Sequence, residues 1–397
     1  MNSTTIWILV AFIAYMAMML LIGASYMKTG KSTEDYFLGG RKLGGWVVAL
    51  SAQASDMSGW LLMGLPGSVY ALGTGQMWIA VGLFLGTVAN WIIISGRLRR
   101  YTIVANNSLT LPAYFENRFH DKKRILLGIS SVVIVIFFLV YTASAFASGG
   151  KLFSTVFGCS YHVSLTIGAV IILAYTFMGG FMAVCTTDFI QGMLMLVALV
   201  TVPVVAFALM GGNVGPALEQ TGVTAANFLN VMKNGDNNFS AVEIISQLAW
   251  GLGYCGMPHI LVRFMAVKNQ KELNKSKGIA IIWVALSLAF AVVIGVLGRA
   301  YLYPTILGAD GGSTEIVFIE MIKQVFTVDI RLPIVAGLFL CGILAAIMST
   351  ADSQLLVTAS SMSEDIYKGI IKKETAVLVV RCNGAAGCGV DLLWKSF

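Results

Sequence analysis

The sequence predicts an all-α fold, a polytopic bundle of helices that cross a membrane several times. Of the 397 residues, 57% are hydrophobic and only 11% are charged, and the mean hydropathy is +0.83. A water-soluble globule of this length cannot bury so much apolar surface. Lipid offers no partners for open backbone groups, and the alternating pattern of a barrel is absent, so we expect the spans to be helices.

Nine apolar runs are long enough to cross a bilayer core, which needs roughly 20 residues per helix. The expected spans are residues 6–26, 46–73, 77–95, 125–147, 162–181, 187–209, 241–264, 278–302 and 332–358. Between the third and fourth spans, residues 108–124 are too polar to cross, and their apolar residues recur at helical spacing. This segment predicts a short helix at the inner surface. The outer segment 211–240 is rich in Gly and Asn and is expected to be irregular.

The formal charge of +7 is distributed unevenly along the chain. If the amino terminus is outside, the inner segments hold 21 of the 26 Lys and Arg residues. The five left outside are Lys151, Lys233, Arg299, Lys323 and Arg331. The positive-inside rule therefore predicts a multi-pass protein of the cytoplasmic membrane with its amino terminus outside. The positive charge needs no nucleic acid partner to explain it.

The second span is interrupted by polar and helix-breaking residues. The stretch SAQASDMSGW at 51–60 places Asp56 inside an otherwise apolar run that continues to Gly64 and Pro66. A charged residue at mid-bilayer costs about 2.5–3.5 kcal/mol, so such residues face a cavity and mark functional sites. Proline and glycine weaken the helix around it, which predicts a broken helix.

The seventh span has the same character, with three glycines and Pro258 within SQLAWGLGYCGMPHI at 246–260. The two interrupted spans lie five crossings apart, so they run in opposite directions. Broken helices at equivalent positions of oppositely oriented halves are typical of an inverted-repeat transporter with its site at the midplane. Unpaired carbonyls at a break can bind a cation, and unpaired N–H groups can hold an anion.

The ninth span adds the adjacent hydroxyls of Ser349 and Thr350, one turn after Ala346. Hydroxyls in a membrane helix often bond back to their own backbone, and the spacing leaves that alternative open. Two neighbouring hydroxyls beside small residues, facing a broken helix, also suit a monovalent cation held by neutral oxygens.

Six ordered motifs resemble the sodium/solute symporter family over about residues 7–370. They are DYFLGGR (35–41), LSAQASDMSGWLLMGLPG (50–67), LTLPAYFENRF (109–119), AYTFMGGFMAVCTTDFIQ (174–191), WGLGYCGMPHILVRFMA (250–266) and ILAAIMSTADSQLL (343–356). The resemblance implies two inverted five-helix repeats behind one extra helix, and movement of Na⁺ and a solute together by alternating access. No cofactor is implied beyond Na⁺ as the coupling ion, and no enzymatic step. The expected partners are Na⁺, a small-molecule solute and the lipid bilayer; the oligomeric state stays open.

The resemblance also implies roles for individual residues. The sodium site would use backbone carbonyls of Ala54, Met57 and Ala346 with the hydroxyls of Ser349 and Thr350, and Asp56 would support it. The positions that match the solute pocket or its gates are Ser58, Gly59, Trp60, Tyr141, Trp250, Tyr254 and Pro258. Arg41 and Asp188 match charged positions at the inner mouth.

Each assignment has a plainer alternative. Tyr141 and Trp250 taken singly are the kind of aromatic residue that packs in a membrane core. Arg41 alone is an ordinary positive-inside residue, and Asp188 near a span end is equally well explained as a helix N-cap. Met257 departs from the family pattern, in which Gln is common, and this loss of an amide bears on which solute fits.

The carboxyl-terminal tail, residues 374–397, departs further from the family. The resemblance implies further full spans here, but the longest apolar run of RCNGAAGCGVDLLWKSF and the residues before it is too short to cross a bilayer. The symporter domain is therefore expected to end near residue 373, with an incomplete second repeat and a truncated or frame-shifted tail.

The function that these observations predict is sodium-coupled uptake of a small solute, with L-proline expected first. The alternatives are the same fold with another amino acid, a sugar acid or a short carboxylate as solute, and a membrane fragment that carries nothing. A sensory module is disfavoured because no regulatory domain is recognised, and a hydrolase because no base is paired with Ser55 or Ser58.

Overall fold

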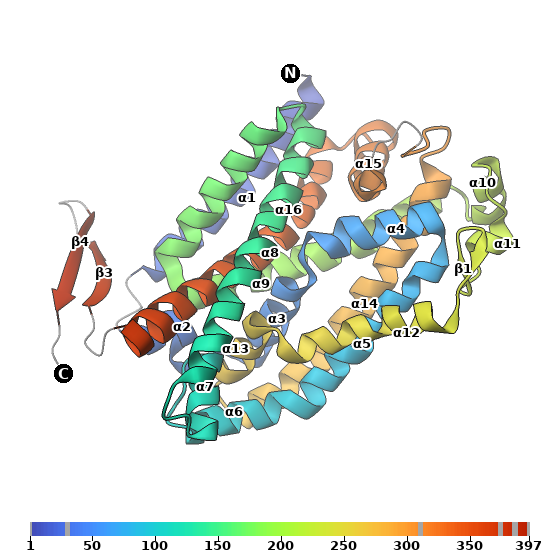
Figure 1. Cartoon of the computed structure of the whole chain (residues 1–397). Coiled ribbons are helices and arrows are strands. Elements are labelled where there is room, and N and C mark those ends of the chain that lie inside the picture. Colours follow the sequence, from blue (N-terminus) through green and yellow to red (C-terminus); the bar gives the residue numbers. More distant parts are fainter. Residues whose placement is uncertain (1, 28–31, 309–312, 372–375, 383–387, 395–397) are drawn as a thin grey trace.

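The computed structural model describes residues 2–27, 32–308, 313–371, 376–382 and 388–394, and it is a bundle of long helices (Figure 1). Six helices within these residues are long and apolar enough to span a membrane: Ser3–Tyr26, Thr74–Val104, Ile125–Phe157, Gly179–Leu209, Gln270–Tyr301 and Pro333–Ile371. The two interrupted spans are built from shorter pieces and add to this set. The predicted all-α membrane bundle is confirmed.

The first interrupted span is broken where the sequence predicts it. Helix α3 (Gly45–Gly59) contains Ser58 at φ 49°, ψ −176°, outside the helical region. A π-helical turn (Trp60–Gly64) follows, and α4 (Leu65–Leu72) begins with proline in its first turn. Proline is tolerated there because a first-turn N–H has no intrahelical partner. The break therefore lies two residues after Asp56, deep inside the protein.

The second interrupted span has an even longer break. Helix α12 (Ala241–Ala249) starts with a capping box between Ser240 and Glu243. A 3₁₀ stretch, η5 (Trp250–Gly256), leads to Met257, which is extended at φ −76°, ψ 106°, and α13 (Pro258–Ala266) follows. Glycine-rich sequence makes the 3₁₀ stretch accessible, and Pro258 restarts the helix.

The two broken spans lie antiparallel along their length. Before α3, Leu43 forms a local parallel bridge with Val267 just beyond α13, and further along Ser51 accepts a hydrogen bond from Arg263. At the breaks, the Tyr254 hydroxyl contacts the Met57 Sδ. Residue numbers rise on one span as they fall on the other, as the predicted opposite orientation requires.

The remaining spans surround this pair. They are α1 (Ser3–Tyr26), α5 (Met77–Ala89) continued through a π turn into α6 (Ser95–Val104), α8 (Ile125–Phe157), α9 (Tyr161–Leu209), α14 (Gln270–Tyr301) and α16 (Pro333–Ser360) with the π-helical extension Ser361–Ile371. In the most apolar 18-residue segment of the α16 span, 83% of the segment is buried, against 22 to 44% in the corresponding segments of the other five spanning helices. Helix α16 therefore occupies the centre of the bundle, where polar side chains can serve a site.

The boundary between the fifth and sixth spans is a break inside one helical run, α9, at Gly180 (φ 58°, ψ −161°), next to the expected end of the fifth span at residue 181. The positive φ is open to glycine, and the ring of Tyr36 lies so close that a Cβ at Gly180 would meet it at 2.8 Å. The inner loop expected at 182–186 is therefore helical, and Asp188 lies well inside the second part of α9.

The connecting segments contain more structure than the sequence suggests. The inner helix expected at 108–124 is α7 (Leu111–Phe119), capped by the Thr110 side chain. The outer segment, expected to be irregular, contains α10 (Val214–Gln220), α11 (Ala225–Phe228) and the hairpin of β1 (Lys233–Asn234) with β2 (Asn237–Asn238). A helix outside the nine expected spans, α15 (Val317–Lys323), precedes α16, and α2 (Thr33–Leu38) precedes α3.

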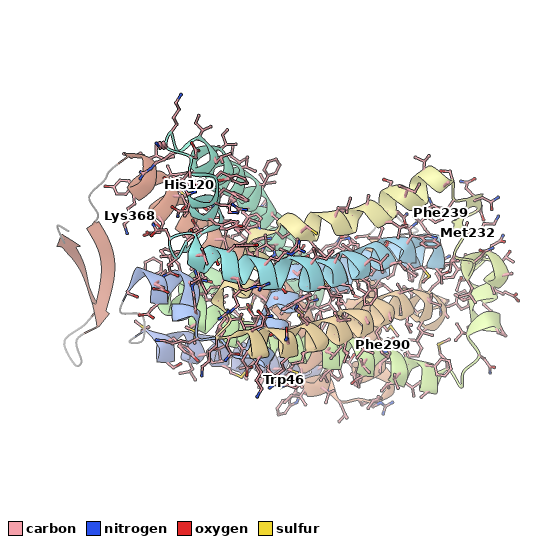
Figure 2. All side chains as sticks on the ribbon, turned by 90° about the horizontal axis from the view of Figure 1, so that it is seen from below. Trp46, His120, Met232, Phe239, Phe290 and Lys368 are labelled. Carbon is pink, nitrogen blue, oxygen red and sulfur yellow. The ribbon has the colours of Figure 1, made fainter. Side chains whose placement is uncertain are left out.

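Segments expected on the same side of the membrane lie at the same end of the bundle. Figure 2 shows His120 and Lys368 at one end and Met232 and Phe239 at the other. Of the tail, the described residues are β3 (Ala376–Cys382) and β4 (Cys388–Trp394), which pair antiparallel; the rest of 374–397 lies outside the described residues.

Candidate functional site

The hydroxyls of α16 meet the first break. The Ser349 hydroxyl donates to the Ala54 carbonyl at 2.8 Å and approaches the Ala346 carbonyl at 3.3 Å. The Thr350 hydroxyl donates to the same Ala346 carbonyl at 3.1 Å. Ser349 and Thr350 are fully buried. Four of the five expected sodium ligands therefore lie together, and the local backbone bonding that the sequence left open is present as well.

Met57, the fifth expected ligand, lies one turn further along α3. Its carbonyl accepts the backbone N–H of Trp60 across the break. Its side chain lies beside Tyr254 from the second broken span. The carbonyl of Met57 is thus part of the break itself, next to the cluster around Ser349.

Asp56 lies between the first break and the second. It is 5% exposed, and its Oδ1 has no hydrogen-bond partner among the described residues. Tyr254 lines the same cavity, and its hydroxyl contacts the Sδ of the neighbouring Met57. A buried carboxyl with a free oxygen is costly, so its position at a cavity wall is that of a group that meets a ligand.

A cavity of about 430 Å³ opens beside these groups, between the two breaks. Six of the seven residues expected at the solute pocket line it: Ser58, Gly59, Trp60, Tyr141, Trp250 and Tyr254. The seventh, Pro258, begins α13 and lies outside the lining, whereas Met257 before it belongs to the wall. The indoles of Trp60 and Trp250 meet edge to face, with ring centroids 5.2 Å apart.

Two carboxyl groups lie in the cavity wall. Its ionisable acids are Asp56 at the break and Glu315 near the outer end, and its lining contains no Lys, Arg or His. Lys151 on α8 forms an ion pair with Glu315 at 2.6 Å. The backbone of Gly67 on α4 passes so close that a Cβ there would lie 2.8 Å from the Glu315 Cα.

Sequence reasoning missed several residues of this wall. Ser144 and Ser148 follow Tyr141 at helical spacing on α8, and Met63 lies in the π turn after the first break. The spacing from Tyr141 was a usable signal for the two serines. Nothing in the sequence near Glu315 indicates that its segment folds back onto the cavity.

Asp188 forms a buried ion pair instead of a helix cap. Its Oδ2 lies 2.9 Å from the Arg263 guanidinium, and both side chains are at most 1% exposed. The Ser51 hydroxyl donates to the same carboxylate at 2.6 Å, and Arg263 also donates to the Ser353 hydroxyl. The N-cap alternative is therefore wrong, and so is the counting of Arg263 among the inner-loop charges. The pair ties α9 to α13, α3 and α16.

Arg41 holds the inner end of the bundle together. Its guanidinium donates to the Met265 carbonyl at 2.7 Å and the Ser108 carbonyl at 3.0 Å, and its Nε donates to the Asn107 side chain at 3.1 Å. Burial lowers the pKa of the Arg41 guanidinium from its ordinary value, and Glu34 acts in the opposite direction. Arg41 and Asp188 both bind α13, Arg41 at the Met265 carbonyl and Asp188 at the Arg263 guanidinium.

The arrangement can hold a monovalent cation and a small solute next to each other. Neutral oxygens from the Ala54 and Ala346 carbonyls and two hydroxyls suit an ion that gives up its water readily. The cavity, whose wall includes Asp56 and Met57 just beyond Ala54 on α3, suits a compact solute with an apolar body. The cluster and the cavity wall therefore both use the backbone of α3 at the first break.

Comparison with known proteins agrees with this arrangement. The profile of the sodium:solute symporter family matches residues 36–381. The sodium/proline symporter of Escherichia coli (strain K12) is 45% identical over 370 residues, which cover 93% of this chain and 72% of that protein. The sodium/proline symporter of Staphylococcus aureus is 45% identical over 362 residues, 91% of this chain and 68% of that protein.

A solved structure has the same fold. It is a Na⁺-coupled sialic acid symporter in a substrate-bound, outward-open state, with a TM-score of 0.75 over 92% of this chain and 76% of its own. Its sequence is 22% identical, so the likeness speaks for the architecture alone.

Proposed function

The chain belongs to the sodium:solute symporter family, and we propose that it takes up L-proline into the cell together with Na⁺. One observation carries the proposal: the buried hydroxyls of Ser349 and Thr350 meet the carbonyl oxygens of Ala54 and Ala346 beside a cavity of about 430 Å³. Oxygen ligands at a helix break and an adjoining small-molecule cavity are the two parts that a coupled transporter needs.

The chemistry of the cavity favours a zwitterion over an organic anion. Asp56 and Glu315 are the carboxyl groups of the wall, Glu315 is paired with Lys151 from outside the lining, and the lining itself lacks a cationic side chain. A solute ammonium is attracted to such a wall, whereas a sugar acid or a short carboxylate would be repelled. The relatives named sodium/proline symporters point to the same solute.

The energy for uptake comes from the ion alone. One charge that crosses 100 mV supplies about 2.3 kcal/mol, which suffices for roughly fifty-fold accumulation of a neutral solute. The proposal therefore includes no covalent step and no enzymatic activity. It places the chain in the cytoplasmic membrane with its amino terminus outside, since that orientation puts most Lys and Arg residues inside.

The test is uptake of labelled L-proline by proteoliposomes that contain the purified chain. We expect accumulation with an inward Na⁺ gradient and little with a K⁺ gradient of the same size. A polypeptide that carries nothing would give equal signals in both. Competition with unlabelled sugar acids, short carboxylates and other amino acids tests the solute: displacement by the acids rather than by proline would contradict the assignment.

A further inference from the structure

Helix α5 contains a π-helical turn, Asn90–Ile94 (η4), at its junction with α6. Its first two side chains, Asn90 and Trp91, are at most 1% exposed. A π turn inserts one extra residue into a helix, is rare, and concentrates at functional sites. Neither residue lines the cavity or joins the cluster around Ser349, so the site described above does not explain the turn.

Asn90 forms a hydrogen bond to the backbone of the second break. Its Nδ2 donates to the backbone carbonyl of Tyr254 at 2.8 Å. Tyr254 lies in the middle of η5, where the 3₁₀ backbone leaves carbonyls outside a regular α-helical ladder. The side chain of Tyr254 forms part of the cavity wall and reaches Met57. Asn90 therefore restrains the backbone that orients the side chain of Tyr254.

Trp91, the next residue, holds the first broken span. Its indole Nε1 donates to the Gln53 Oε1 at 3.3 Å. Gln53 directly precedes Ala54, whose carbonyl accepts the Ser349 hydroxyl. The Trp91 ring also packs edge-on against Phe264 of α13, with centroids 4.5 Å apart. Two successive residues of one turn thus contact both broken spans.

Close backbone packing makes this contact rigid. A Cβ at Gly86 would lie 2.1 Å from the Gly251 carbonyl oxygen, and a Cβ at Gly251 would lie 1.9 Å from the Gly82 carbonyl oxygen. Helix α5 and η5 therefore touch through their main chains, with no side chains between them to absorb a shift. A movement of α5 must carry the second break with it.

We propose that the Asn90–Trp91 turn couples the ion site to the solute cavity, an inference that rests on the proposed function. Ion binding orders the first broken span around Ala54. The hydrogen bond between Gln53 and Trp91 then restrains the turn, and the hydrogen bond from Asn90 restrains the backbone at Tyr254. Asn90 and Trp91 are positioning residues, because they touch neither the ion oxygens nor the cavity.

Hydrogen–deuterium exchange of the full chain in lipid nanodiscs tests the coupling. Na⁺ in place of K⁺ is expected to slow exchange at 54–60 and at 250–257 in the unaltered protein. In Asn90→Leu and in Trp91→Phe, which keeps a ring against Phe264, Na⁺ is expected to protect 54–60 only. Loss of a buried hydrogen bond should speed basal exchange at 250–257 in Asn90→Leu by roughly fivefold to tenfold.

The matched control is Thr87→Val, one turn earlier on α5. The Thr87 hydroxyl is buried and has no hydrogen-bond partner among the described residues, so its removal should leave exchange at both breaks unchanged. If Asn90→Leu does not give monodisperse protein, Asn90→Asp, which keeps the shape and removes the amide donor, replaces it. Wild-type protection at 250–257 in both the Asn90 and Trp91 variants overturns the inference.

Transport kinetics separate positioning from general damage. In the unaltered chain we expect saturating Na⁺ to lower the KM for proline; in the two variants the KM should lose most of this Na⁺ dependence while the maximal rate is kept. If Na⁺ changes neither exchange nor uptake in the unaltered chain, the proposed function fails. The positioning role is then decided by basal exchange at 250–257, and equal rates in Asn90→Leu and the unaltered chain overturn it.

Discussion

At the scale of single residues, the protein keeps buried polar groups where an apolar residue would pack more easily. Asp56 has an oxygen without a partner among the described residues, and Ser349 and Thr350 point at carbonyls instead of lipid. Such groups cost free energy in the folded state unless a ligand meets them. They are therefore the residues whose substitution should alter function more than stability.

Asp56→Asn removes the charge and keeps the shape. We expect the Na⁺ concentration for half-maximal proline uptake to rise at least about tenfold, since hydrogen bonds and contacts of charged groups contribute 1.5–3 kcal/mol. Uptake by proteoliposomes over a range of Na⁺ concentrations measures this. An unchanged Na⁺ requirement would remove Asp56 from the mechanism.

The double substitution Ser349→Ala with Thr350→Ala removes both hydroxyls from α16. The Na⁺ concentration for half-maximal uptake should again rise about tenfold, because two of the proposed oxygen ligands are lost. Expression and size-exclusion behaviour should remain normal, since each hydroxyl adds only about 1 kcal/mol to folding. Normal Na⁺ dependence would mean that the hydroxyls serve only the helix backbone.

Asp188→Asn should act on stability. It leaves the Arg263 guanidinium buried without a counter-charge, and breaking such a pair costs about 3–5 kcal/mol. A marked fall in the melting temperature in detergent is expected. The double variant Asp188→Asn with Arg263→Gln removes both charges and should recover much of the loss; a single variant as stable as the unaltered protein would contradict this account.

At the scale of elements, backbone contact between helices decides where side chains can exist. The α5–η5 contact admits only glycine at three positions, and the Gly67 backbone approaches the Glu315 segment in the same way. Glycine weakens a membrane helix locally, yet here it allows the broken span to lie directly against its neighbour. The breaks are therefore held by their surroundings and are not merely loose segments.

Gly251→Ala should be strongly destabilising, because the added Cβ would lie 1.9 Å from the Gly82 carbonyl oxygen. Overpacking of this kind costs about 1–3 kcal/mol. Gly253→Ala, two residues later in η5, is the matched control, since a Cβ there meets nothing within 4 Å among the described residues. Melting temperatures of the two purified variants should differ clearly, and equal values would refute the contact.

At the scale of the whole molecule, the ion cluster and the cavity meet along α3 at the first break. The Ala54 carbonyl belongs to the cluster, and Asp56 and Met57, two and three residues later, belong to the cavity wall. An ion that binds the folded protein and not the unfolded chain stabilises it, and a shared wall should make the second ligand bind better after the first.

Na⁺ is therefore expected to raise the melting temperature of the purified chain, and proline should raise it further only when Na⁺ is present. A Na⁺ concentration 100 times the dissociation constant corresponds to about 2.7 kcal/mol. Thermal unfolding in NaCl and in KCl at equal ionic strength measures the effect. Equal stabilisation by proline in both salts would show that the two sites are independent.

The sequence by itself determined the class of fold, the position of both breaks and most of the site. Composition requires membrane helices, and Gly, Pro and Asp within apolar runs are so unfavourable in lipid that they mark the breaks at 51–66 and 246–260. Six of the seven solute residues that the family resemblance implies line the cavity, and five of these six lie at the two breaks.

Only the tertiary structure decided which distant residues complete the site. The Glu315 segment, the pairing of Asp188 with Arg263, and the hold of Asn90 on Tyr254 join residues far apart in the chain, and no local pattern announces them. That the chain turns at Gly180 without a loop was likewise not predicted, because a short loop and a single left-handed glycine between two apolar runs look alike in sequence. The local residue types determine where a helix breaks, whereas tertiary packing determines which distant residues contact the break.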